Sequence, residues 1–403
     1  QLWFKAGHGD ERSFVGERSS IVIPGLTLAR QTDFLTTPRT DDAQLRYTRV
    51  LGEGREMSVG VEASRLRTSN GVQQDSNFTP PGSKVLRNTL DSTDKDRSAV
   101  TYAGGRWSGG RWELEGSLAW ATYRKDRNFV VTVPSPPGST AITENYDRDG
   151  AKASLGAAYR FQPGRVARLM CQNWTRPASL GTLAPVAVAG IVIDDQLVFP
   201  GGKLSRCRGQ VEWEVASVAF LTIAADAKRI DNLASPLDGV LNTRADVTNL
   251  DRLRNRLLPL PPKPDALEDT PVFSLANVET ASVGLEHILT RSLAARLYYA
   301  YTDSETTYPG FQGNHVPYLP RHLASVGATW TMAGRSYLST QAVYRSRRFS
   351  DESNLAPMAA GWDMQVRAYV ELDRKHWTLE AYALNLLKKD ASDVFGVIAT
   401  YRF

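Results

Sequence analysis

The chain has 403 residues, enough for two or three ordinary domains, so a single domain of this size needs a repetitive architecture. Hydrophobic residues make up 42% of it and charged residues 23%, and its longest nearly uninterrupted apolar stretch, Leu183–Ile193, is far shorter than the ~18 residues of a membrane-spanning helix. The formal charge is +5, but lysine and arginine form no basic run, which argues against a nucleic-acid partner.

The chain starts with residues typical of a strand. Leu2, Trp3 and Phe4 are apolar, and no charged segment followed by an apolar segment, as in a secretion signal, is present at the start. We therefore expect a targeting signal to lie outside this sequence. The same expectation makes residues 1–403 the C-terminal domain of a longer chain.

From there on, apolar residues recur at every second position in pairs of segments separated by short gaps. This period predicts β-strands, and a short gap between two strands predicts a hairpin. With one strand at each end, seven hairpins give about sixteen strands, each near the ~9–11 residues that cross a bilayer at a tilt. In chain order the short gaps are Gly52–Gly54, Ser108–Gly110, Pro163–Gly164, the residues between Val215 and Leu221, Leu289–Ser292, Ala333–Arg335 and Asp373–Lys375.

Long linkers join one hairpin to the next. They are rich in Pro, Gly, Ser, Asn and Asp, which is typical of surface loops, and a further hairpin could be hidden in Glu11–Asp42 or Asp231–Pro271. Short turns on one side and long loops on the other are typical of an outer-membrane barrel, with periplasmic turns and extracellular loops. The linkers are Asn70–Asp96, Thr132–Asp147, Pro177–Gly202, Asp231–Pro271 and Ser304–Pro320.

The predicted fold class is therefore all-β: a transmembrane antiparallel up-and-down β-barrel in the bacterial outer membrane, with both termini in the periplasm. A soluble propeller or sandwich would also show many short strands, but a propeller repeats every ~40–50 residues and no such self-similarity is visible. Aromatic residues near strand ends favour the barrel because they can form the girdles at the membrane interface. These residues are Trp107, Trp112, Phe161, Trp213, Trp330, Trp377 and Phe403.

The last strand, Asp393–Phe403, alternates in the same way and ends on an aromatic residue. Phe395, Val397, Ala399, Tyr401 and Phe403 share one face, which we expect to lie toward lipid. We expect this strand to pair with Gln1–Gly9 and close the barrel. The strand resembles the signal read by the barrel-assembly machinery, and the resemblance assigns that signal to Gly396, Ala399, Tyr401 and Phe403.

Four stretches in the C-terminal third resemble the barrel of TonB-dependent receptors. They match that family's Tyr-Thr-Asp strand exit, Pro-Arg-His strand entry, late strand exit and Asn-Leu turn before the closing strand. The stretches are Leu289–Thr306, Val316–Trp330, Val343–Asn354 and Ala383–Asp390. The resemblance implies an outer-membrane receptor barrel. The chain departs from the family because no plug domain or TonB-binding segment is present, and because about sixteen strands are closer to polymer-secretion porins than to the twenty-two of such receptors.

Motifs of catalysis are missing from the sequence. The histidines, His8, His287, His315, His322 and His376, have no ligand spacing, and no GxSxG, HExxH or phosphate-binding glycine loop occurs. We therefore expect no enzyme activity, no cofactor and no metal site, with the histidines in structural or rim positions.

Charged residues alternate with the apolar rows and are expected to face the lumen. They can hydrate a channel or pair with one another and fill the interior, and the sequence leaves both interpretations open. The predicted pore-lining residues are Arg206, Arg208, Glu212, Asp226, Glu286, Arg296, Arg367 and Glu371.

The two cysteines, Cys171 and Cys207, fall on the outward face of consecutive strands at similar heights. A cross-strand disulfide and two unpaired small residues facing lipid are both consistent with this placement.

The leading functional hypothesis is an outer-membrane channel that gives passage to a solute or an exported polymer, since a sixteen-stranded barrel can enclose an aqueous lumen. The alternatives are a TonB-dependent-receptor-like uptake protein whose plug lies outside this sequence, and a surface-binding anchor displayed by the long loops. Expected partners are outer-membrane lipid and lipopolysaccharide, the barrel-assembly machinery, and a periplasmic or extracellular protein, but no nucleic acid.

Overall fold

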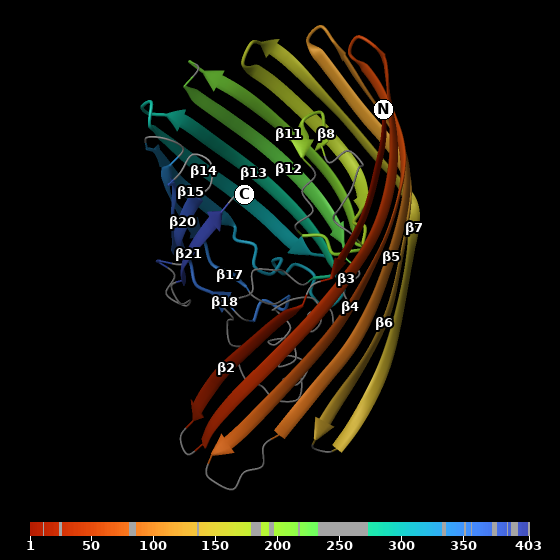
Figure 1. The fold of residues 1–403 in the computed structure, drawn as a ribbon, viewed down its shortest axis with the longest axis vertical. Helices are drawn as coiled ribbons and strands as arrows, with labels where there is room; N and C mark the ends of the chain where they lie inside the picture. Colours follow the sequence, from red (N-terminus) through yellow and green to blue (C-terminus); the bar gives the residue numbers. More distant parts are fainter. Residues whose placement is uncertain are drawn as a thin grey trace.

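A computed structural model of the chain shows one large antiparallel sheet that curves around an interior (Figure 1). Among the described residues no helix is long and apolar enough to cross a membrane. The structure describes residues 1–10, 12–23, 26–79, 86–134, 137–178, 187–192, 197–216, 218–232, 273–332, 336–349, 352–355, 357–372, 377–384, 386–387 and 394–401.

Nearly every strand pairs with its neighbour in sequence. The strands of the large sheet are β1 (Leu2–Asp10), β2 (Ser13–Ile23), β3 (Leu26–Gly52), β4 (Arg55–Thr79), β5 (Leu86–Gly109), β6 (Trp112–Pro134), β7 (Pro137–Gln162), β8 (Arg165–Thr175), β11 (Lys203–Val215), β12 (Ala219–Asp231), β13 (Leu275–Ile288), β14 (Leu293–Thr306), β15 (His322–Thr331), β16 (Tyr337–Arg345), β19 (Gly361–Glu371), β20 (Trp377–Leu384) and β21 (Val394–Tyr401). Two small hairpins lie outside it: β9 (Ala187–Val188) with β10 (Ile191–Val192), and β17 (Arg348–Phe349) with β18 (Pro357–Met358).

The predicted hairpins and strand number are confirmed. β1 and β2 lie end to end along β3, so the 17 strands of the sheet occupy sixteen positions. The β2–β3 hairpin lies inside Glu11–Asp42, one of the two segments in which a further hairpin was considered. The other segment, Asp231–Pro271, lies mostly outside the described residues.

The two faces of the sheet differ as the alternation predicts. Large apolar side chains stay exposed on the outer face, as Leu118, Leu155 and Phe395 do at 70%, 69% and 70%. Polar and charged side chains such as Arg206 and Asp226 are buried on the inner face. Exposed apolar rows are stable only against lipid, so the outer face is the membrane-facing one.

Aromatic residues cluster beside the short turns. Trp112 contacts Tyr159 with ring centroids 4.6 Å apart, and Tyr159 contacts Phe161 at 5.0 Å. Trp213 lies under Arg165, and Trp377 contacts Tyr401 at 4.9 Å. These rings follow one edge of the membrane-spanning band, as an interfacial girdle does. Of the predicted girdle residues, Phe403 lies outside the described ones.

The prediction of long loops is wrong for two segments, which are strands in the structure. Asn70–Asp96 and Thr132–Asp147 continue as strands, which makes β3–β7 23 to 27 residues long, more than twice the length of a membrane span. Their outer ends extend well beyond the other strands (Figure 1). The polar composition of these segments suggested loops. A strand outside lipid can carry polar residues on both faces, so it does not show the alternation of apolar and polar residues by which a membrane-spanning strand is predicted.

Charged side chains pair across the strands where the extension begins. Arg127, with 0% exposure, contacts Asp94 through two bonds of 3.1 Å, and Tyr123 donates a 2.6 Å bond to Asp96. Lys125 lies 3.5 Å from Asp94. Cross-strand pairs of this kind supply the register that an apolar row supplies inside the membrane.

The predicted seam between the two ends of the chain is wrong for the described residues. β21 pairs with β20 and β1 pairs with β3, and no ladder joins β1 to β21. The sheet therefore has two edges, β1 with β2 on one side and β21 on the other. The curvature of the sheet places these two edges apart (Figure 1).

Candidate functional site: the inner wall

The charged residues of the inner face are organised as cross-strand ion pairs. Arg168 holds Glu212 through bonds of 2.9 and 3.2 Å between β8 and β11. Arg296 and Glu286 lie 2.9 Å apart between β14 and β13. Glu286 lies directly opposite Arg296 in the ladder, and Glu212 lies diagonally across from Arg168, two residues beyond its direct partner Gln210. Both arrangements place the two charges on one face of the sheet.

One buried cluster of the inner wall contains two arginines and one aspartate. Arg206 contacts both carboxylate oxygens of Asp226 at 2.9 and 3.0 Å, and Arg208 contacts the same carboxylate at 3.3 Å. The Arg206 and Asp226 side chains are 2% and 4% exposed, whereas 25% of the Arg208 side chain is exposed. Two guanidinium groups share one carboxylate, so this part of the wall keeps a positive charge that an anion in the lumen can approach.

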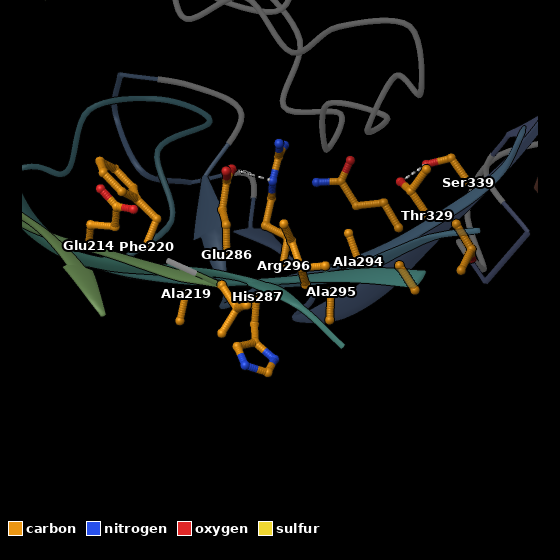
Figure 2. Close-up of a pocket in the computed structure, with 16 residues that line it drawn as sticks. Glu214, Ala219, Phe220, Glu286, His287, Ala294, Ala295, Arg296, Thr329 and Ser339 are labelled. Atoms are coloured by element: carbon orange, nitrogen blue, oxygen red, sulfur yellow. Dashed lines mark hydrogen bonds and ion pairs between the residues drawn. The ribbon is translucent and has the colours of Figure 1, made fainter. Parts of the chain in front are cut away.

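A hollow of about 490 Å³ lies against β11–β16 near the short turns. Figure 2 shows the side chains that project from the two sides of the sheet at this hollow. On one side lie Glu214, Phe220, Glu286 and Arg296, and on the other lie Ala219, His287 and Ala295. A dashed line joins Glu286 to Arg296 and another joins Thr329 to Ser339, whose hydroxyls lie 3.2 Å apart. The hollow thus offers a carboxylate, an ion pair, hydroxyls and one aromatic ring to a polar solute.

An amide ladder continues this polar surface across β15, β16 and β19. Gln341 donates a 2.9 Å bond to the Ser325 hydroxyl and accepts a 2.8 Å bond from Gln365. Sequence reasoning did not select these residues, nor Arg168. The alternation of Gln341 with Thr340 and Ala342 was readable, but uncharged polar side chains carry no signal of their own in a sequence.

The predicted pore-lining residues all lie on the inner face. Arg206, Arg208 and Asp226 form one cluster, Glu212 pairs with Arg168, and Glu286 pairs with Arg296. Arg367 pairs with Glu380 at 3.0 Å, and the backbone N–H of Glu371 donates to Ser336. Pairing within the wall is therefore the rule, and binding of a solute by these residues remains a proposal.

The remaining predicted residues lie as follows. The structure joins Cys171 and Cys207, directly opposite each other in the β8–β11 ladder, by a disulfide with Cα atoms 4.1 Å apart. Gly396, Ala399 and Tyr401 are part of β21, whereas Phe403 lies outside the described residues. Among the described residues no group of three His, Cys, Asp or Glu side chains could hold a metal ion. His8 bonds to Asp41, and His322 bonds to Tyr299, in line with structural and rim positions.

Comparison with known proteins shows which fold this sheet resembles. Residues 260–386 match the family model described as "TonB dependent receptor-like, beta-barrel". The fold is that of a TonB-dependent receptor barrel. No curated protein matches the sequence.

Solved structures agree over nearly the whole chain. The ferric yersiniabactin uptake receptor FyuA from Yersinia pestis is similar with a TM-score of 0.57 at 11% identity, over 100% of this chain and 59% of that one. The siderophore receptor PiuA from Acinetobacter baumannii is similar at 0.55 and 13%, over 98% and 64%. The ferric citrate transporter FecA is similar at 0.51 and 11%, over 99% and 58%.

The chain thus spans about three fifths of the length of these receptors. The likeness extends to the N-terminal strands, which the family model does not match. TonB-dependent receptor barrels are bacterial outer-membrane proteins, and this chain has their fold. The matched proteins are receptors and transporters, not enzymes. Nothing in the comparisons supports export of a polymer.

Proposed function

We propose that this chain is the barrel of an uptake receptor of the TonB-dependent type, and that its cargo is an anionic metal chelate. The match of residues 260–386 to the receptor barrel model carries the proposal. The names of the similar structures, which are receptors and transporters of ferric chelates, indicate the cargo class.

The inner wall supports an anionic cargo. Arg206 and Arg208 share the single carboxylate of Asp226, and Arg208 is the more exposed of the two. The register places Lys228 directly opposite Arg206, on the same face. Positive charge in a confined lumen raises the local concentration of an anion.

A growth and uptake assay tests the proposal. A strain that lacks the gene is grown under iron limitation on a panel of ferric chelates, and uptake of labelled iron is measured with and without a working TonB system. We expect uptake of at least one chelate to require both the gene and TonB. Uptake that persists in the absence of TonB would favour an open channel, and gene-independent growth on every chelate would contradict the proposal.

The role of the wall is tested with Arg208→Gln. A hydrogen bond to a charged group contributes about 1.5–3 kcal/mol, so we expect uptake affinity for the anionic chelate to fall roughly 10- to 100-fold. Arg229→Gln is the matched control, because Arg229 lies on the outer face of the neighbouring strand β12. If both variants bind the chelate with equal affinity, Arg208 of the inner wall takes no part in recognising the cargo.

A further inference from the structure

Basic side chains form two rows on the outer face of the sheet, where β3–β6 leave the membrane-facing band. The far row, which is the more distant from the short turns, lies directly across β3, β4 and β5 and consists of Arg39, Arg67 and Lys95. The near row lies directly across β4, β5 and β6 and consists of Arg65, Arg97 and Arg124. Like charges directly opposite each other destabilise a sheet, so a bound anion would stabilise both rows.

Two of these six cations already have partners. Arg97 lies 3.8 Å from Asp126, which is directly opposite Lys95. Arg124 lies 3.2 Å from Asp147. The other four form no ion pair within the part of the chain that the structure describes. We call these four the cation cluster: Arg39, Arg65, Arg67 and Lys95. Its three arginines are exposed and its lysine is half-buried, so a ligand can reach them from outside.

Two further carboxylates lie beside the cation cluster. Asp41 is directly opposite Arg65, but its Oδ1 lies 2.7 Å from Nδ1 of His8, with which it pairs. Asp10 is directly opposite Arg39 at the edge of the sheet. Four cations therefore face two carboxylates, and the cation cluster keeps a net positive charge.

The cation cluster lies at the height of the lipid headgroups of the outer leaflet. Arg124, in the near row, is twelve residues beyond Trp112 of the girdle on the same strand, β6. Twelve residues span about 40 Å of strand, or roughly 30 Å across the membrane at a tilt of ~40°. The apolar band of a barrel is about 25 Å tall, so both rows lie just outside it.

Small and apolar side chains begin directly below the near row on the same face. The next row toward the short turns contains Ala43, Ala63 and Ala99. The row after that one is 42%, 44% and 54% exposed at Leu45, Val61 and Trp120. This surface therefore offers cations to a phosphate group and an apolar wall to an acyl chain of the same molecule.

We propose that the cation cluster binds the phosphate groups of a lipopolysaccharide molecule, whose acyl chains lie against the apolar rows below. Lipopolysaccharide is the lipid of the outer leaflet, and its phosphate groups lie at headgroup height. A guanidinium group binds phosphate through two parallel hydrogen bonds, and strands ~4.8 Å apart bring several cations within reach of one phosphate. The inference concerns the outer face alone and does not depend on the cargo proposed above.

Paired variants on the same strands separate the cation cluster from a general effect of charge. Arg65→Gln with Arg67→Gln removes two cations of the cluster, and Arg65→Lys with Arg67→Lys keeps their charge. Arg49→Gln with Arg55→Gln is the matched control, because both are exposed arginines on the same face of β3 and β4 at the opposite edge of the membrane. Circular dichroism checks that each protein keeps its strand content.

The readout is the binding of purified lipid A, with and without its phosphate groups, to the full-length protein in detergent. We expect the wild type and the control to prefer the phosphorylated form, and the affinity of the glutamine variant for it to fall roughly 10- to 100-fold. The lysine variant should lose less, since it keeps the charge and loses only the paired hydrogen bonds. Added salt should weaken the binding of phosphorylated lipid A to the wild type.

Three outcomes would overturn the proposal. The first is equal affinity of the glutamine variant and the control for phosphorylated lipid A. The second is a wild type that binds both forms of lipid A equally and regardless of salt, and this measurement needs no variant to fold. The third is displacement of lipid A by inorganic phosphate alone, which would indicate a site for free phosphate. The assay contains neither a chelate nor TonB, so its result is independent of the uptake test.

Discussion

Two glycines of the sheet each accommodate a tyrosine from the strand beside them. Gly60 lies directly opposite Tyr102, and Gly396 directly opposite Tyr382. A Cβ atom at either glycine would overlap the tyrosine ring that lies over it. The ring covers the exposed backbone of the glycine, and the absent side chain lets the ring lie against the sheet.

Gly396→Ala should therefore destabilise the C-terminal hairpin β20–β21. Overpacking of this kind costs about 1–3 kcal/mol, and the double variant Gly396→Ala with Tyr382→Ala should recover most of it. Unfolding by urea in lipid vesicles measures the effect. Gly361→Ala serves as the control, because a Cβ atom at Gly361 meets nothing within 4 Å. If the Gly396→Ala protein is as stable as this control, Tyr382 does not pack over Gly396.

We expect one half-buried carboxyl, that of Glu352, to make the outer loops sensitive to pH. Glu352 lies in the loop before β18, where its backbone carbonyl accepts a 2.9 Å bond from Asn314 and its side chain accepts a bond from the Ser274 N–H. Burial raises the pKa of Glu352 from 4.5 to about 7, against the smaller opposite effect of the bond from Ser274.

The docked loop therefore favours the protonated carboxyl. Docking is strongest below pH 4.5, weakens as pH rises toward 7, and changes no further above it. We expect amide exchange of residues 352–355, corrected for its intrinsic pH dependence, to be faster at pH 8 than at pH 5. Glu352→Gln should abolish the difference, and a pH effect that persists in this variant would assign it to another group.

At the scale of the strand pair, the disulfide joins β8 to β11 on the outer face. Both cysteines face lipid, and the intervening segment contains the β9–β10 hairpin. In the chain-entropy model a bridge over 36 residues contributes roughly 3–4 kcal/mol. It fixes the two strands that hold this hairpin, since Arg168 and Arg206 donate bonds to the Ala189 and Val192 carbonyls.

Thiol labelling of the unfolded protein measures this bond. We expect no labelled cysteine without reductant and two labelled cysteines after reduction. Cys171→Ser alone should leave one reactive thiol, which controls for accessibility. Two labels without reductant would show that the cysteines are unpaired in the membrane.

The extended ends of β5 and β6 depend on buried charges. Removing one member of a buried ion pair leaves an uncompensated charge and costs about 3–5 kcal/mol, whereas an exposed pair contributes about 0–1 kcal/mol. Arg127→Gln should therefore loosen the extension, which limited proteolysis in whole cells would detect. Arg97→Gln is the control, because it breaks the exposed pair between Arg97 and Asp126, which lie 3.8 Å apart. Equal protease resistance of both variants would contradict a stabilising role of the buried Arg127–Asp94 pair.

At the scale of the whole molecule, the girdle and the short turns fix the orientation in the membrane. We expect the turn at Glu53 to lie in the periplasm and the loop at Gln312 to lie outside the cell. A membrane-impermeant thiol reagent should label Gln312→Cys in intact cells, and Glu53→Cys only after permeabilisation. Both positions are exposed in the structure, so the reverse pattern would invert the topology.

Strand number, hairpin pairing and the outer and inner faces could be predicted from the sequence. The period of two is a local property, and an exposed apolar row against lipid needs the same alternation whatever the rest of the fold does. The inner-face positions of Arg206 and Glu286 were predicted for this reason, and so were the outer-face positions of Cys171 and Cys207 at similar heights.

Only the tertiary structure decided what the polar segments do. Asp94 and Arg127 are far apart in sequence, so their pairing could not mark Asn70–Asp96 as strand, and Val188 in a loop gave no sign of burial against Gly156. The separation of β1 from β21 depends on the accumulated curvature of sixteen strands. Alternation determines which face each residue takes, because it is set by backbone geometry, but contacts across the interior depend on how distant segments meet.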